Sequence, residues 1–156
     1  MTDEDYMRLA LEEAQASSLR GEVPVGAVLV NPVTQDIVAR SGNAPISGYD
    51  PTAHAEILAL REAARITGNY RLSGLTLYVT LEPCTMCAGA ISHARIRRVV
   101  YGATDIKGGA IDSGVKFFEQ PSCHHRPDVT AGLLGEEAGA MLKSFFKSRR
   151  NKDRLK

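Results

Sequence analysis

The sequence predicts an α/β fold in which helices cover both faces of a mixed sheet. Two observations carry this prediction. Two apolar strand patterns flank a short turn early in the chain, as in a hairpin. After them, strand and helix patterns alternate, which is typical of parallel strands joined by helices on both faces of a sheet. The length of 156 residues fits a single domain over 1–156.

The first third of the chain supplies one helix and the hairpin. Thr2 is a predicted N-cap that begins a capping box, and apolar residues at helical spacing continue to a stop at Gly21. The Val-rich run "PVGAVLV" at 24–30 predicts a buried strand, and "IVARS" at 37–41 pairs back on it across "NPVTQD". Residues 42–52 hold Gly, Pro, Asn and Asp and are predicted to form a loop.

The rest of the chain alternates helices and strands. A helix is predicted over about 53–67, ended by Gly68, and the alternating pattern of "LTLYVTL" at 75–81 predicts a central strand. The later elements are a helix at 84–94, a strand at 97–102, a short amphipathic piece around 115–118 within a long loop, a short strand at 129–131 and a final helix. The apolar side of that helix is predicted to carry Leu134, Ala138, Met141, Leu142, Phe145 and Phe146.

The charge is unevenly distributed along the chain. Seven Lys or Arg side chains against one acid give residues 141–156 a charge of +6, whereas the other 140 residues, with 12 basic and 17 acidic side chains, carry −5. A basic helix and tail on an acidic body favours an anionic partner. The alternative is a solvated tail that aids solubility.

Other bulk features point to the cytoplasm and to metal binding. No apolar run reaches the ~18 residues of a membrane span, and the acidic start "MTDEDYMRLA" lacks the basic-then-apolar order of a signal peptide. We therefore expect a cytoplasmic protein with no membrane partner. The odd, small number of cysteines (Cys84, Cys87 and Cys123) argues against a disulfide framework and favours a metal for the closely spaced pair.

The motif "LEPCTMC" predicts two metal ligands. If Cys84 opens a helix, Pro83 sits where a helix tolerates proline. Cys84 and Cys87 then share one helix face at the spacing i, i+3. Their sulfurs lie near the positive end of the helix, which favours the thiolate form that zinc binds.

Four histidines compete to complete this site. His93 lies nearly two turns beyond the second cysteine, too far along the helix to fold back. His124 and His125 follow Cys123 in a loop, where a second metal site is an alternative, but three adjacent residues rarely chelate one zinc and satisfied histidines are favoured. His54, at a helix start after a loop, gives the three-ligand set of a catalytic zinc with one open position.

Glu56 then acquires a predicted role as the acid–base group. On an ideal helix, residues two apart point about 200° away from each other. His54 and Glu56 can therefore address one metal only if it lies off the amino end of the helix. The alternative is a solvent-facing Glu56. His-x-Glu followed by Pro-Cys-x-x-Cys after a strand is the pattern of zinc-dependent nucleobase deaminases.

The chain also resembles a known family, the bacterial tRNA-specific adenosine deaminases within the cytidine-deaminase-like fold. The segments that carry the resemblance are "DPTAHAEILALREA", "NYRLSGLTLYVTLEPCTMCAGAI" and "RIRRVVYGA", and the likeness runs from the first helix to "FFKSRR". It implies a three-layer α/β/α sandwich around a five-stranded mixed sheet, a homodimer, one Zn²⁺ per subunit, and conversion of adenosine to inosine at the wobble position of the tRNA anticodon loop.

The resemblance also implies roles for individual residues. His54, Cys84 and Cys87 would bind zinc, and Glu56 would be the proton shuttle. The implied substrate contacts are Val25, which would wall the base pocket; Asn43 and the Ala55 backbone N–H, which would bind the target nucleotide; Asp105 and Lys107, which would touch flanking nucleotides; and Phe145 and Arg149, which would hold the RNA from the final helix.

Two other functions remain open from the sequence. A deaminase of a free base or nucleoside, of guanine or cytosine type, would share the zinc motif and Glu56, but it would gain little from a basic final helix. A non-catalytic, zinc-stabilised RNA-binding module would need the zinc ligands but not Glu56. Activity on RNA and the effect of replacing Glu56 separate these alternatives.

Overall fold

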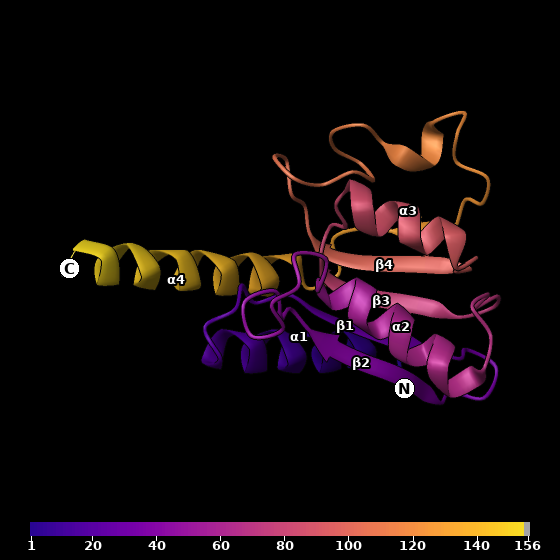
Figure 1. The fold of residues 1–156 in the computed structure, drawn as a ribbon, viewed down its shortest axis with the longest axis horizontal. Coiled ribbons are helices and arrows are strands. Elements are labelled where there is room, and N and C mark those ends of the chain that lie inside the picture. The colour runs from indigo at the N-terminus through magenta and orange to yellow at the C-terminus, as the bar shows by residue number, and fades with distance from the viewer. Residues whose placement is uncertain (155–156) are drawn as a thin grey trace.

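The computed structural model describes residues 1–154, which form one mixed sheet and its covering helices (Figure 1). The strands of this part of the chain are β1 (Gly26–Val30), β2 (Ile37–Gly42), β3 (Thr76–Leu81), β4 (Arg98–Ala103) and β5 (Asp128–Thr130). They form a five-stranded sheet in the order β2-β1-β3-β4-β5. β1 is antiparallel to β2 and β3, whereas β3, β4 and β5 are parallel. The predicted mixed sheet is confirmed.

Helices cover both faces of this sheet. The described helices are α1 (Asp3–Leu19), α2 (Ala55–Thr67), α3 (Thr85–His93), α4 (Gly135–Arg154) and a 3-10 turn, η1 (Phe117–Glu119). α2 and α3 lie side by side on one face, and α1 packs on the other with the start of α4 (Figure 1). The predicted α/β/α sandwich is therefore confirmed, with element ends within two or three residues of those expected.

The central strand β3 divides the core into two layers. Leu77 and Val79 pack in the cluster under α2 and α3, whereas Tyr78, between them, packs against Tyr6 of α1. All three β3 side chains are at least 96% buried. This alternation is the period-2 pattern expected of a strand that is covered on both faces.

α1 begins as predicted, because Thr2 caps it with the predicted capping box.

The close contact between α1 and β1 depends on a glycine. A Cβ built on Gly26 would lie 1.9 Å from the backbone oxygen of Ala10, closer than two atoms can approach. Only glycine allows the helix to lie so near the strand.

The last helix differs from the prediction in its start and in the burial of its apolar side. α4 begins at Gly135, so Leu134 lies before the helix, in a backbone conformation with φ of 54°. The helix then runs past the sheet edge at which the amino ends of α2 and α3 lie (Figure 1). The sheet therefore cannot cover the whole apolar side of the helix: Ala138 is buried, but Phe146 is 44% exposed. Of the predicted basic tail, Lys156 lies outside the described residues.

Within the described residues, no helix combines the length and the apolar character needed to cross a membrane.

Candidate zinc and catalytic site

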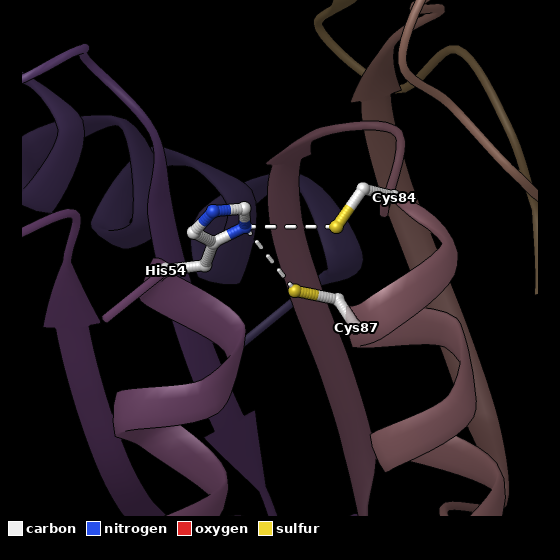
Figure 2. A group of neighbouring side chains, drawn as sticks. All are labelled: His54, Cys84 and Cys87. Carbon is white, nitrogen blue, oxygen red and sulfur yellow. Dashed lines mark hydrogen bonds between the residues drawn. The ribbon is translucent and has the colours of Figure 1, made fainter. Parts of the chain in front are cut away.

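The three predicted metal ligands come from the amino ends of neighbouring helices. His54 is the N-cap of α2, with an extended backbone (φ −71°, ψ 152°) and no capping bond from its side chain. Cys84 is the N-cap of α3, directly after β3, and Cys87 lies in the first turn of that helix. Because both helices start at the same edge of the sheet, their first residues converge (Figure 2).

The spacing of these side chains fits a tetrahedral zinc ion. The Nδ1 atom of His54 lies 3.6 Å from the sulfur of Cys84 and 3.5 Å from that of Cys87 (Figure 2). Ordinary zinc–nitrogen and zinc–sulfur bond lengths at tetrahedral angles would place such atoms about 3.6 Å apart. One ligand atom from each of the three residues lies within 4.8 Å of the others. The fourth corner of the tetrahedron is left for a small ligand.

The surroundings of the two thiols move their pKa values in opposite directions. A hydrogen bond from Cys87 lowers the pKa of Cys84 to about 5. The same hydrogen bond, together with burial, raises the pKa of Cys87. The lowered pKa favours the thiolate of Cys84, and binding of zinc would release the proton of Cys87, because zinc binds the deprotonated sulfur.

Glu56 lies beside the metal ligands and is nearly inaccessible to solvent. It belongs to the first turn of α2, is 4% exposed, and hydrogen-bonds with Cys87. Burial raises the pKa of Glu56, so this carboxyl group holds a proton more readily than an exposed glutamate does. His54 and Glu56 meet at one site because that site lies off the end of the helix, as the spacing requires.

A cavity of about 340 Å³ opens above these residues. Its walls are Val23, Val25, Asn43, Pro45, His54, Glu56, Leu81, Glu82, Cys84, Asp105 and Gly108. The structure thus brings predicted substrate contacts Val25, Asn43 and Asp105 to the same cavity as the metal ligands and Glu56. Lys107 is exposed on the loop that carries Asp105.

Asn43 and Ala55 are joined to each other. The backbone N–H of Ala55 donates a 2.8 Å hydrogen bond to Oδ1 of Asn43, so Asn43 satisfies one of the free donors at the start of α2. The Ala55 N–H, predicted to contact the substrate ring, therefore has a protein acceptor here. Oδ1 of Asn43 is thus occupied by the protein, and Asn43 is at the same time part of the cavity wall.

Phe145 and Arg149 lie outside the catalytic cavity. They line a separate cleft of about 560 Å³ between α4 and the end of α1. The guanidinium of Arg149 stacks 5.1 Å from the ring centre of Phe145 and donates a hydrogen bond to the backbone oxygen of Gly21. The pair therefore braces α4 against α1, and its RNA contact stays a prediction.

Two residues of the "CHH" run, Cys123 and His125, are part of the packing, whereas His124 is exposed. Cys123 is buried and its sulfur donates a hydrogen bond to the backbone oxygen of His125. The Nε2 atom of His125 lies 2.7 Å from the backbone oxygen of Ile96 and ties this loop to the end of α3. In the part of the chain that the structure describes, the metal-ligand cluster found is that of His54, Cys84 and Cys87.

Two buried carboxylates near the cavity, Glu22 and Glu82, were not predicted from the sequence. They are 1% and 2% exposed. Each sits next to a proline-containing turn at an end of a strand pattern, in "GEVPV" and "LEPC". A charged residue directly beside an apolar strand pattern could have indicated a buried carboxylate, since a charge in that position must have buried hydrogen-bond partners.

The fold and this site define a class of zinc-dependent deaminases. Residues 1–103 match the family model described as the cytidine and deoxycytidylate deaminase zinc-binding region. A tRNA-specific adenosine deaminase of Agrobacterium fabrum is 55% identical over 148 residues, which cover 95% of this chain and 96% of that relative. The corresponding Bacillus subtilis protein is 45% identical over 96% of this chain and 92% of its own. The chain therefore belongs to the family of tRNA-specific adenosine deaminases.

Solved structures agree with this assignment. A structure from a study of A-to-I editing by tRNA:A34 deaminases superposes with a TM-score of 0.86 at 56% identity, over 88% of this chain and 99% of that chain. A guanine deaminase from Nitrosomonas europaea superposes with a TM-score of 0.75 at 26% identity, over 91% of this chain and 83% of its own. The fold is therefore shared by enzymes that act on different bases.

Proposed function

We infer that this protein is a zinc-dependent hydrolase that converts adenosine to inosine at the wobble position of tRNA and releases ammonia. The observation that carries the catalytic part is the convergence of His54, Cys84 and Cys87 with the buried carboxyl of Glu56 at one cavity. The tRNA part is supported by relatives at 45–55% identity that are named for this activity. As an enzyme of tRNA, the protein would work in the cytoplasm.

The reaction exchanges the amino group at C6 of adenine for the oxygen of water. Zinc held by the three ligands supplies a Lewis acid that lowers the pKa of water to about 7. Glu56 takes a proton from the attacking water and delivers it to ring N1. It then takes the proton of the hydroxyl group now on C6 and passes it to the amine, so that the C6–N bond breaks, ammonia leaves and the C6 carbonyl forms. One carboxyl group thus serves both transfers. The surrounding residues exclude solvent from it, since Glu56 is 4% exposed.

The competing function is deamination of a free base, as in the guanine deaminase that shares the fold. A base or nucleoside would be held by the cavity alone, whereas an anticodon loop also presents phosphates to the surrounding surface. Incubation with an anticodon stem-loop and, separately, with guanine tests the choice by mass analysis. We expect one inosine in the stem-loop; rapid deamination of guanine with an untouched stem-loop would reverse the assignment.

We expect the basic end of α4 to bind RNA phosphates. Lys147, Arg150 and Lys152 are exposed on the part of the helix that projects beyond the sheet. Replacing all three by Gln should weaken binding of a stem-loop and reduce the slope of log affinity against log salt by about two to three. Deamination of free adenosine should stay unchanged, because the cavity is intact.

The matched control for this prediction replaces Lys116, an exposed lysine of the loop before η1, by Gln. Its salt dependence should equal that of the wild type. Deleting residues 147–156 is a coarser form of the same test, since it also removes the bond from Arg149 to Gly21. Unchanged RNA affinity in the triple variant would make the tail a solubility device.

The proposal includes a homodimer. An apolar groove of about 380 Å³ lies between the outer sides of α2 and α3, lined by residues such as Leu60, Ala64 and Ala90. Tyr70 at its rim is 71% exposed. A second copy of the chain would cover these apolar side chains. In sedimentation experiments we expect the wild type to be a dimer and the Tyr70→Glu variant to be a monomer. Tyr49→Glu, at a more exposed loop tyrosine, is the control; a monomeric wild type would contradict the proposal.

A further inference from the structure

Two buried carboxylates bind the loops that flank the catalytic cavity, and Glu82 is also part of the cavity wall. Glu82 follows β3 and is 2% exposed, and Glu22 lies between α1 and β1 and is 1% exposed. Neither has a part in the proton transfers described above. A buried ionised carboxyl group is costly unless hydrogen bonds satisfy it, so the partners of these two side chains indicate what they do.

Glu82 gathers one loop around its two oxygens. Oε2 accepts hydrogen bonds from the backbone N–H groups of Ile111 (3.0 Å), Asp112 (2.9 Å) and Ser113 (3.0 Å). Oε1 accepts from the backbone N–H of Asp105 (3.0 Å) and from the hydroxyl of Ser113 (3.0 Å). Five donors from residues 105–113 thus converge on one carboxylate, and this loop carries the predicted substrate contacts Asp105 and Lys107.

The same loop is pressed against the segment that carries the metal ligands. The backbone N–H of Ala110 donates a 2.9 Å hydrogen bond to the oxygen of Pro83. Gly109 forms a bridge with Cys84. A Cβ on Gly109 would lie 2.4 Å from the carboxyl carbon of Glu82, so glycine is required for this approach. The loop, Glu82 and the start of α3 therefore form one packed unit.

Glu22 holds a second loop of the cavity wall in the same way. Its Oε1 accepts a hydrogen bond from the backbone N–H of Ile46 (3.2 Å). Its Oε2 accepts from the N–H (2.8 Å) and the hydroxyl (2.9 Å) of Ser47. These residues belong to the loop that begins at Asn43 and includes Pro45, both of which line the cavity.

We propose that Glu22 and Glu82 are positioning residues that hold the two loops flanking the cavity in the arrangement that binds the RNA substrate. This inference rests on the proposed function for the identity of the substrate. A loop held in place before binding loses less conformational entropy when the substrate arrives, so its anchor contributes to affinity. The chemical step depends on Glu56 and the metal ligands, and Glu22 and Glu82 take no direct part in it.

The test uses the isosteric variants Glu22→Gln and Glu82→Gln in the zinc-loaded enzyme. Both carboxyl oxygens of each residue accept backbone N–H bonds. The amide NH₂ must therefore face at least one of these donors, whichever way it turns. Glu119→Gln is the control, because Glu119 is an exposed glutamate of η1. Ser113→Ala and Ser47→Ala are milder variants that each remove one hydroxyl donor.

We expect faster amide hydrogen exchange in residues 105–113 of Glu82→Gln and in residues 43–48 of Glu22→Gln, at unchanged zinc content. The KM for an anticodon stem-loop should rise about tenfold or more, as expected for the loss of bonds to a buried charged acceptor, whereas kcat should stay within about threefold. The serine variants should shift KM in the same direction by less, and Glu119→Gln should change neither quantity.

Wild-type exchange rates in both loops of the Gln variants would overturn the proposal. A fall in kcat with unchanged KM would also overturn it, because the residues would then act on the chemical step. If the wild type forms no inosine in a stem-loop, the proposed function fails. The exchange measurement still decides separately whether the two carboxylates hold the loops.

Discussion

Glu56→Gln is expected to lose inosine formation by at least about 100-fold while keeping its zinc and its fold. The amide has nearly the shape of the carboxyl group but cannot accept the proton of water or pass it on. The variant should also melt no lower than the wild type in the metal-free state at neutral pH. Burial raises the pKa of Glu56 in the folded protein above its value in the unfolded chain. At a pH above that unfolded value, the buried carboxyl group therefore lowers the free energy of unfolding, and a neutral Gln removes this destabilising contribution.

Inosine is measured by mass analysis of the RNA, zinc by elemental analysis, and stability by thermal unfolding. Glu62→Gln is the matched control, since Glu62 lies on the same helix with its side chain 42% exposed and pairs with Arg65. It should keep full activity. Retention of most activity by Glu56→Gln would remove the catalytic role of Glu56 and favour a zinc-stabilised RNA-binding module.

Cys87→Ser is expected to lose zinc and, with it, activity. The serine hydroxyl is not ionised at neutral pH and is a poor replacement for a thiolate, so two ligands remain where the geometry provides three. The measurements are zinc content after dialysis and inosine formation. A chelator should destabilise the wild type toward heat but leave the melting temperature of Cys87→Ser unchanged, because the variant has no bound zinc to lose.

Cys123→Ser is the control for this prediction. Cys123 is also buried, but it donates to the backbone oxygen of His125, which a serine hydroxyl can do as well. It should keep one zinc per chain. Full zinc occupancy in Cys87→Ser would contradict the ligand set.

The sequence predicted the fold and the group of three metal ligands because each contributing element shows a local pattern. The period of "LTLYVTL" identified the central strand, and Thr2 marked the start of α1. The spacing of His54 and Glu56 required a site off a helix end, and His54 is the N-cap of α2. Each of these features is determined by residues a few positions apart.

The loop anchors could not be predicted in this way. Glu22 and Glu82 bind donors between 23 and 31 residues further along the chain, and no local period links such positions. The bond of Asn43 to Ala55 likewise joins two segments across a loop. Predicting these contacts requires the three-dimensional path of the loops.

The sequence pattern also could not predict that α4 projects beyond the sheet. The spacing of its apolar residues predicts one buried side, but burial depends on how far the sheet extends beneath the helix. α4 continues beyond the end of the sheet (Figure 1), and Phe146 on its apolar side is exposed.

We infer that the site of His54, Cys84, Cys87 and Glu56 deaminates adenosine in RNA. The most direct test is mass analysis of an anticodon stem-loop with adenosine at the wobble position after incubation with the protein, with zinc measured on the same sample. We expect that adenosine to be converted to inosine by protein that contains one zinc per chain. An unchanged stem-loop in the presence of zinc-loaded protein would contradict it.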